Sequence, residues 1–294
     1  MEPPVGLAPE YRDVLAGEIR LRITEWSSRG SSGEAIVALP GALAPRASFV
    51  ELGRRLASDF RFVAVDLPGF GESEKPSPGR FEYSPPAIAE SITYLISALG
   101  VGRAHVLGHG LGGAVAIHLG ARRPELVRSL GLICPLGPPE GIPDWARFAL
   151  APVVGDLIFR QLLTEGMFSR LYRGRVQKSA SPTTLAAYFE ALRSPASRLA
   201  LLALLRSSID TRPIIADCRR IRCPSLVLWG RDDGLFGLKS GRLLAREIPG
   251  TGFEIFDSGH APHEEEPDRT AETLARFFKG ERAGTQLARA SRPR

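Results

Sequence analysis

Gly108-His109-Gly110-Leu111-Gly112-Gly113 is the most informative segment of this 294-residue chain for its fold class. An apolar run, residues 104–107, precedes it, and a helical pattern of small residues, 113–120, follows it. A strand, a glycine-rich turn and a helix packed closely behind it form the context in which Gly-x-Ser-x-Gly acts as a nucleophile elbow. The central position of that pattern is Gly110 here, so the stretch predicts the turn without its hydroxyl.

Apolar runs and helical patterns alternate on both sides of this turn. Residues 1 to about 12 look loose, and residues 18–26 alternate as a half-buried strand does. The continuous apolar runs, typical of strands that are buried on both faces, are residues 35–39, 62–65, 104–107, 130–133 and 225–229. Such alternation predicts an α/β fold with a doubly wound, mostly parallel sheet covered by helices.

The middle of the chain breaks this alternation, because it contains helical stretches and breakers but no strand signal. The sequence therefore predicts four parts: residues 1–134 as the first part of the α/β core, 135–213 as a helical cap, 214–280 as the last part of the core, and 281–294 as a basic disordered tail. The tail supplies about half of the net charge of +6, with four arginines against one glutamate.

Composition limits the function classes. The basic excess lies in the tail rather than in a patch, so we expect no nucleic-acid partner. No apolar run reaches membrane-spanning length, and no membrane partner is expected. The three cysteines lack metal-type spacing, and no phosphate loop is present, so we expect a cytoplasmic protein without metal or cofactor that takes a small-molecule substrate or ligand. The oligomeric state stays open.

The chain resembles the α/β-hydrolase family of the helical-cap type over about residues 18–280, with Gly110 where the family has its serine. The turn Trp229-Gly230-Arg231-Asp232-Asp233 looks like the family's acid turn, which implies Asp233 as the acid and Asp232 as the alternative. Ser258-Gly259-His260 resembles the histidine loop and implies His260 as the base. An aspartate on one ring nitrogen fixes the tautomer and leaves the other nitrogen free.

The resemblance also implies an oxyanion hole and a pocket. Leu39-Pro40-Gly41-Ala42 falls where the family usually has His-Gly, so the amides of Ala42 and Leu111 are the expected donors. The candidate pocket residues are Pro40, His109, Cys134 and Trp145. Aromatic and aliphatic residues of the cap are expected mostly in its own core, and the rest indicate an apolar, medium-sized substrate. Arg160, Arg170 and Arg173 either select an acidic group or form a solvated face.

Gly110 excludes covalent ester hydrolysis by the usual route at this position, because glycine has no oxygen that could attack. Two interpretations remain. In the first, a His260–Asp233 base and two amides carry out non-covalent chemistry, as a lyase, a cyclase or a water-directed hydrolase, on a small, mostly apolar carbonyl compound. In the second, the protein is an inactive relative that binds a small molecule or a protein partner, and glycine relieves the strain of the turn.

Overall fold

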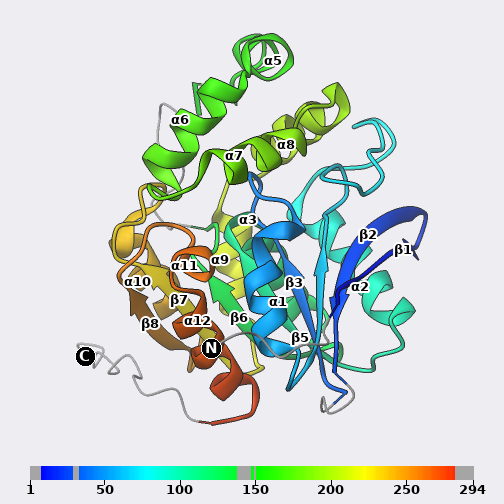
Figure 1. Cartoon of the computed structure of the whole chain (residues 1–294), viewed down its shortest axis with the longest axis vertical. Coiled ribbons are helices and arrows are strands. Elements are labelled where there is room, and N and C mark those ends of the chain that lie inside the picture. Colours follow the sequence, from blue (N-terminus) through cyan, green and yellow to red (C-terminus); the bar gives the residue numbers. More distant parts are fainter. Residues whose placement is uncertain (1–7, 29–32, 138–146, 149, 282–294) are drawn as a thin grey trace.

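An eight-stranded sheet runs through the centre of the molecule in the order β1-β2-β4-β3-β5-β6-β7-β8 (Figure 1). The computed structural model describes residues 8–28, 33–137, 147–148 and 150–281. β2 pairs antiparallel with β1 and with β4, and the other neighbouring strands are parallel. The predicted α/β fold with a doubly wound, mostly parallel sheet is confirmed. The strands are β1 Glu10–Ala16, β2 Ile19–Trp26, β3 Ala35–Leu39, β4 Arg61–Val65, β5 Ala104–His109, β6 Val127–Ile133, β7 Ser225–Gly230 and β8 Gly252–Phe256.

The burial of the strands follows their sequence patterns. Every residue of β3, β5 and β7 is buried, as expected for central strands with helices on both faces. β1 was not predicted, since residues up to about 12 looked loose. It lies at the edge of the sheet, and only Val14 and Ala16 at its end are buried while Tyr11 and Leu15 are exposed, so its first half shows no buried face that would identify a strand.

Helices cover both faces of the sheet. The 3₁₀ helix η1 leads into α1, which contacts α12, and α11 contacts both; α2, α3, α9 and α10 form a second row of neighbours. In the described part of the chain, no helix is both long enough and apolar enough to cross a bilayer. The bounds are η1 Arg46–Phe49, α1 Val50–Leu56, α2 Pro85–Ala98, α3 Gly110–Arg122, α9 Arg212–Cys218, α10 Gly237–Glu247, α11 Pro262–Glu265 and α12 Pro267–Phe278.

The glycines of the turn after β5 let α3 approach the sheet closely. A Cβ atom at Gly112 would lie 2.1 Å from the Leu39 carbonyl oxygen of β3, and one at Gly108 would lie 2.4 Å from the Gly112 carbonyl oxygen. Contacts this short are incompatible with any side chain. The glycines therefore fix the distance between the start of α3 and the end of β3.

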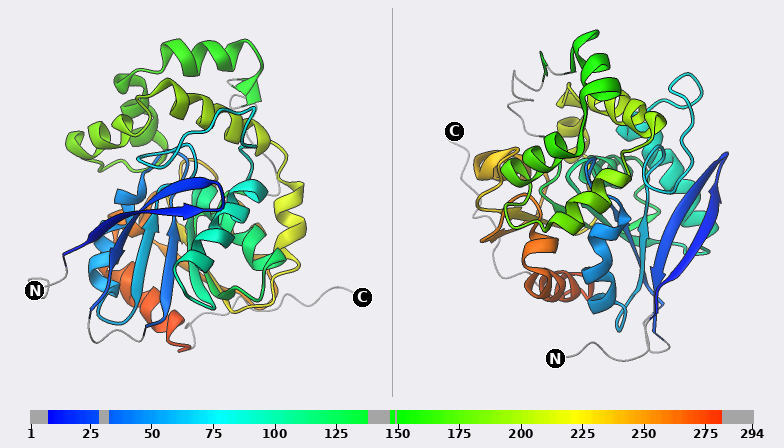
Figure 2. Two further views of the ribbon diagram at one scale, coloured as in Figure 1. Left: turned by 90° about the vertical axis from the view of Figure 1, so that its right-hand side faces the viewer. Right: turned by 45° about the horizontal axis from the view of Figure 1, so that its top comes forward.

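A layer of helices lies over the carboxyl ends of the parallel strands (Figures 1 and 2). It consists of α5 Val154–Leu157, the π-helix η2 Ile158–Leu162, α6 Glu165–Arg175, α7 Pro182–Glu190 and α8 Pro195–Ser207. Side-chain oxygens of Thr164, Ser181 and Ser194 cap α6, α7 and α8. The sequence prediction divided α9 between cap and core; in the structure it contacts α3 and α10. Residues 138–146 of the predicted cap and 282–294 of the predicted tail lie outside the described residues.

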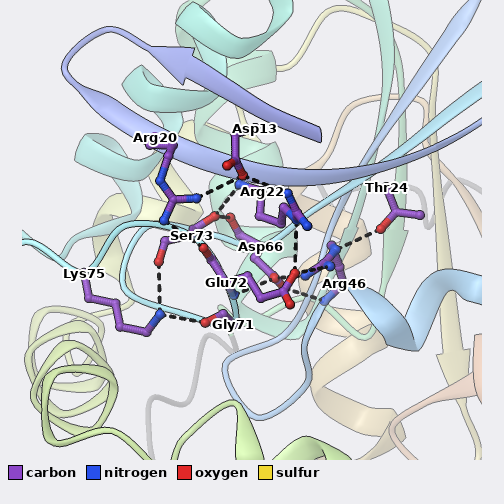
Figure 3. Close-up of polar contacts among 10 residues, drawn as sticks. All are labelled: Asp13, Arg20, Arg22, Thr24, Arg46, Asp66, Gly71, Glu72, Ser73 and Lys75. Carbon is purple, nitrogen blue, oxygen red and sulfur yellow. Dashed lines mark hydrogen bonds and ion pairs between the residues drawn. The ribbon is translucent and has the colours of Figure 1, made fainter. Parts of the chain in front are cut away.

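A buried carboxylate anchors the loop that follows β4 (Figure 3). The Asp66 side chain is fully buried and accepts hydrogen bonds from the amide and guanidinium of Arg46 and from the Glu72 amide. Arg46 also donates to the Thr24 hydroxyl of β2 at 2.8 Å and to the Glu72 carboxylate at 2.6 Å. Because Arg46 begins η1, just after the loop that carries Ala42, this network holds that loop against the sheet.

We expect Asp66→Ala to lower the free energy of unfolding by on the order of 3 kcal/mol, because it leaves the guanidinium of Arg46 without its buried partner. Urea unfolding followed by circular dichroism measures the loss. Asp257→Ala is the matched control, since Asp257 pairs with Arg231 at 2.8 Å on the surface, where the pair contributes little. Equal losses in the two variants would contradict a special role for the buried network.

Candidate active site

A histidine and an aspartate meet at the carboxyl ends of β7 and β8. Asp233 follows β7 and His260 follows β8, and Asp233 Oδ2 lies 2.9 Å from His260 Nδ1. The aspartate is 7% exposed and the histidine 4% exposed. A carboxylate accepts hydrogen bonds, so in the neutral ring Nδ1 carries the proton and Nε2 has the free lone pair.

Backbone amides hold the aspartate in place. Asp233 Oδ1 accepts hydrogen bonds from the amides of Leu235 at 2.8 Å and Phe236 at 3.2 Å. Burial alone would raise the pKa of Asp233, but the charge and hydrogen bond of His260 together with these two amides lower it below the usual value. Asp232, the alternative acid, is exposed. The geometry therefore joins His260 to Asp233 rather than to Asp232.

Gly110 lies directly beneath the free nitrogen of the histidine. It is the first residue of α3 and has a φ of 52°, a left-handed value that glycine adopts without strain. A Cβ atom built at Gly110 would lie 3.3 Å from His260 Nε2. The side-chain position at this turn thus faces the histidine, and in this chain the position is empty of side-chain atoms.

Ala42 and Leu111, the two residues expected to supply backbone amides, both lie close to Gly110. Leu111 is the second residue of α3, where helix geometry leaves the N–H groups without acceptors inside the helix. Ala42 lies in the loop after β3. This loop is close to the turn before α3, because a Cβ atom built at Gly41 would lie 3.7 Å from the backbone oxygen of His109. Ala42 and Leu111 both line the cavity above Gly110, together with His260. Oriented N–H groups at such a place can stabilise a negative oxygen.

The cavity has a volume of about 360 Å³ and extends from Gly110 into the helical layer. Among the described residues, its wall includes no Asp, Glu, Lys or Arg, so Arg160, Arg170 and Arg173 do not contribute to it. Its polar side chains are those of His109, His260, Tyr172 and Ser208, and its other side chains are aliphatic or aromatic. The wall residues from the helical layer include Leu150, Ile158, Phe159, Leu163, Met167, Phe168 and Tyr172.

The pocket expectations need corrections. His109 lines the cavity, but Pro40 and Cys134 do not. Pro40 is buried, and its carbonyl faces the close contact with Gly112. The Cys134 thiol is fully buried, where it accepts a hydrogen bond from the Gly230 amide at 3.4 Å and lies near Asp233. Trp145, the fourth candidate, lies outside the described residues.

A metal ion fits this place poorly. Cys134, Asp233 and His260 have potential ligand atoms within 4.8 Å of one another. The atoms of Asp233 and His260 are, however, already joined by their hydrogen bond. Burial, followed by the charge of Asp233, raises the pKa of Cys134 well above its usual value, which disfavours the thiolate that a metal would bind. A bound ion would have to break the arrangement that orients the histidine.

Two further histidines support the loop of His260 from below. His109 Nε2 donates to the His260 carbonyl oxygen at 3.0 Å, and the ring of His263 lies 4.5 Å from that of His109. Burial, followed by the charge of His263, lowers the pKa of His109 well below its usual value; burial, followed by the charge of His260, lowers the pKa of His263 to about 3. His263 is fully buried. Both rings are therefore neutral packing groups under the histidine loop.

The helical layer is attached at the histidine loop itself. The His260 amide donates to the carbonyl oxygen of Val176, just after α6, at 2.8 Å. Glu264 of α11 accepts hydrogen bonds from Tyr172 of α6 at 3.3 Å and from Tyr188 of α7 at 3.1 Å. Its side chain is only 9% exposed, and burial raises its pKa to about 7. Sequence reasoning missed Glu264, since nothing in the local pattern separates it from a surface glutamate.

Comparison with known proteins identifies relatives over most of the chain. The alpha/beta hydrolase fold family matches residues 34–267. The pimeloyl-(acyl-carrier protein) methyl ester esterase of Chromobacterium violaceum is 30% identical, over 73% of this chain and 82% of its own length. The 2-hydroxymuconate semialdehyde hydrolase of Pseudomonas putida is 28% identical, over 74% of this chain and 76% of its own. Among solved structures, a membrane phospholipase A described as a bacterial virulence factor has a TM-score of 0.75 at 26% identity, covering 92% of this chain and 86% of its own.

We expect Glu264→Gln to change the pH dependence of stability. An unfolded glutamate loses its proton near pH 4.5, whereas folded Glu264 keeps it to about 7. Between these values the folded state binds more protons, so this residue makes the free energy of unfolding fall as pH rises. The glutamine cannot ionise. The free energy of unfolding of the variant, relative to that of the wild type, should therefore rise by on the order of 3 kcal/mol between pH 4.5 and pH 7.

Urea unfolding at several pH values measures this gap. Glu190→Gln, an exposed position on α7, is the control and should show no pH-dependent gap. A gap for Glu264→Gln that stays constant with pH would show that the carboxyl titrates normally in the folded protein.

Proposed function

The chain belongs to the alpha/beta hydrolase fold family, and from this premise we propose that it is an enzyme that hydrolyses an uncharged, mostly apolar ester or related carbonyl compound without a serine nucleophile. In this proposal, Gly110 stands where the family has its serine, and His260 with Asp233 acts as a general base on a water molecule. The observation that carries the proposal is the empty side-chain position 3.3 Å from His260 Nε2.

The proposed reaction uses one water and no covalent intermediate. The water lies over Gly110, and His260 Nε2 takes one of its protons as the oxygen attacks the acyl carbon. The carbonyl oxygen becomes negative and is held by the amides of Ala42 and Leu111. His260 then returns the proton to the leaving alcohol as the carbon–oxygen bond breaks, and Asp233 stabilises the imidazolium between the two steps. The products are the acid and the alcohol.

The choice of hydrolysis over elimination or cyclisation rests on the relatives. The esterase and the semialdehyde hydrolase are both hydrolases by name. The same base and amides would also serve proton abstraction beside a carbonyl, so lyase or cyclase chemistry remains compatible with these residues. The uncharged cavity wall supports an apolar substrate and disfavours a free carboxylate in the cavity, because burying that charge without a partner is costly.

The competing proposal is an inactive relative that binds a ligand in the same cavity. The left-handed φ of 52° at Gly110 favours it, since a serine there would carry backbone strain that this chain avoids. The two proposals differ in turnover and not in binding. Ligand binding without turnover, unchanged when His260 is replaced, would support the inactive relative.

Substitutions at Gly110 test the mechanism with short, uncharged p-nitrophenyl esters. Gly110→Ala should lower turnover by about 10²-fold or more, because its Cβ occupies the space of the attacking water. Gly110→Ser has the same Cβ and the same backbone strain but adds a hydroxyl. It should form an acyl-enzyme that intact-protein mass spectrometry detects, whereas the wild type should turn over without an adduct.

His260→Ala is the control, and it should abolish turnover both in the wild-type chain and in the Gly110→Ser variant. An adduct on the wild-type chain would contradict a non-covalent route. Undiminished turnover in Gly110→Ala would exclude a water held over this residue.

A further inference from the structure

Cys134, the residue that follows β6, has an unusual backbone conformation. Among the described residues it is the only non-glycine residue in the left-handed region, with a φ of 40°, where an L side chain is strained. Its amide donates to the Leu228 carbonyl oxygen of β7 at 2.9 Å, and the Leu136 amide donates to the Gly110 carbonyl oxygen at 2.7 Å. The strained residue therefore turns the chain from the sheet towards the start of α3. Strain of this kind is often found at functional sites.

The thiol of Cys134 is in contact with the pair that forms the base. Its sulfur accepts a hydrogen bond from the Gly230 amide at 3.4 Å, and it lies within 4.8 Å of a carboxylate oxygen of Asp233 and of a ring nitrogen of His260. The thiol also makes a hydrogen bond with Asp233. Because the buried sulfur keeps its proton, the thiol is the donor in this bond and the carboxylate is the acceptor.

The carboxylate of Asp233 has an acceptor site for this donor. An ionised carboxylate has about four such sites on its two oxygens. Oδ1 accepts from the amides of Leu235 and Phe236, and Oδ2 accepts from His260 Nδ1. The remaining site belongs to Oδ2, the oxygen that orients the histidine. A second donor at Oδ2 restricts the direction from which this oxygen approaches the ring.

We propose that Cys134 is a positioning residue, whose thiol donates to Asp233 Oδ2 and holds this oxygen in line with His260 Nδ1. The thiol acts through these two residues, since it does not line the cavity. The inference rests on the proposed function, in which His260 is the base. Without the thiol, a space opens beside Oδ2 into which the carboxylate can turn, and the base is aimed at the water for less of the time.

Substitutions at Cys134 test the proposal with the same p-nitrophenyl esters. Cys134→Ala should lower kcat about tenfold and leave KM nearly unchanged, because it removes a hydrogen bond to a charged group but no part of the cavity wall. Cys134→Ser restores a donor and should recover most of this loss. Cys134→Gly also lacks a donor but relieves the left-handed strain, so it should resist urea better than Cys134→Ala and be equally slow.

Cys218→Ala is the matched control. Cys218 of α9 is also fully buried, and burial raises the pKa of its thiol to about 12. The carboxylates that act on this thiol are those of Glu247 and Asp217, not that of Asp233. The control should lose stability in urea, as expected for any truncated buried side chain, and should keep the kcat of the wild type.

Proton NMR tests the same contact without turnover. The Nδ1 proton of His260 should give a low-field signal, which is assigned by its loss in His260→Ala. Cys134→Ala should broaden this signal, because a looser hydrogen bond exchanges its proton with water faster, and Cys134→Ser and Cys218→Ala should keep it sharp.

The proposal would be overturned by a signal that is absent from the wild type or stays sharp in Cys134→Ala, or by equal losses of kcat in Cys134→Ala and Cys134→Ser. A wild-type chain that hydrolyses no ester and still shows the broadening in Cys134→Ala would support the role of the thiol and contradict the proposed function alone.

Discussion

The close approach of α3 to β3 sets the geometry of the site. A side chain at Gly112 would collide with the Leu39 carbonyl oxygen at 2.1 Å, so the start of the helix lies against the end of the strand only because glycine is there. This contact brings the start of α3, which includes Leu111, beside the loop that carries Ala42. It also aims the side-chain position of Gly110 at His260. The Arg46–Asp66 network then holds the other side of that loop, so the backbone opposite His260 is supported from both sides.

Hydrogen bonds connect the helical layer to the histidine loop. The amide of His260 binds the carbonyl oxygen of Val176, and Glu264 holds Tyr172 and Tyr188. A movement of α6 therefore acts directly on the position of the base. The cavity enclosed in this way is almost entirely apolar, and few polar groups besides His260 can compete for a substrate carbonyl. Water exclusion would also strengthen the interaction between the amides and a negative oxygen.

The sequence predicted the elements whose patterns are set by burial on both faces. The continuous apolar runs predicted the parallel strands, and the glycine spacing predicted the turn before α3. β1 escaped prediction because its exposed residues include Tyr11 and Leu15, and α9 because it follows the cap helices without a strand between. The juxtaposition of His260 and Asp233 was expected from resemblance to a family, not from spacing. The buried state of Glu264 and the orientation of Cys134 away from the cavity depend on tertiary packing, which a local pattern does not contain.

In the proposed mechanism, a base and two amides converge on a water molecule over Gly110. A crystal structure with a short alkylboronic acid tests this convergence, because boron adds hydroxide to form a tetrahedral mimic of water attack. We expect one boronate oxygen about 2.7–3.1 Å from the amide nitrogens of Ala42 and Leu111, and a second oxygen over Gly110 within hydrogen-bond distance of His260 Nε2. A boronate bound elsewhere in the cavity, or a His260 ring turned away from it, would rule the mechanism out.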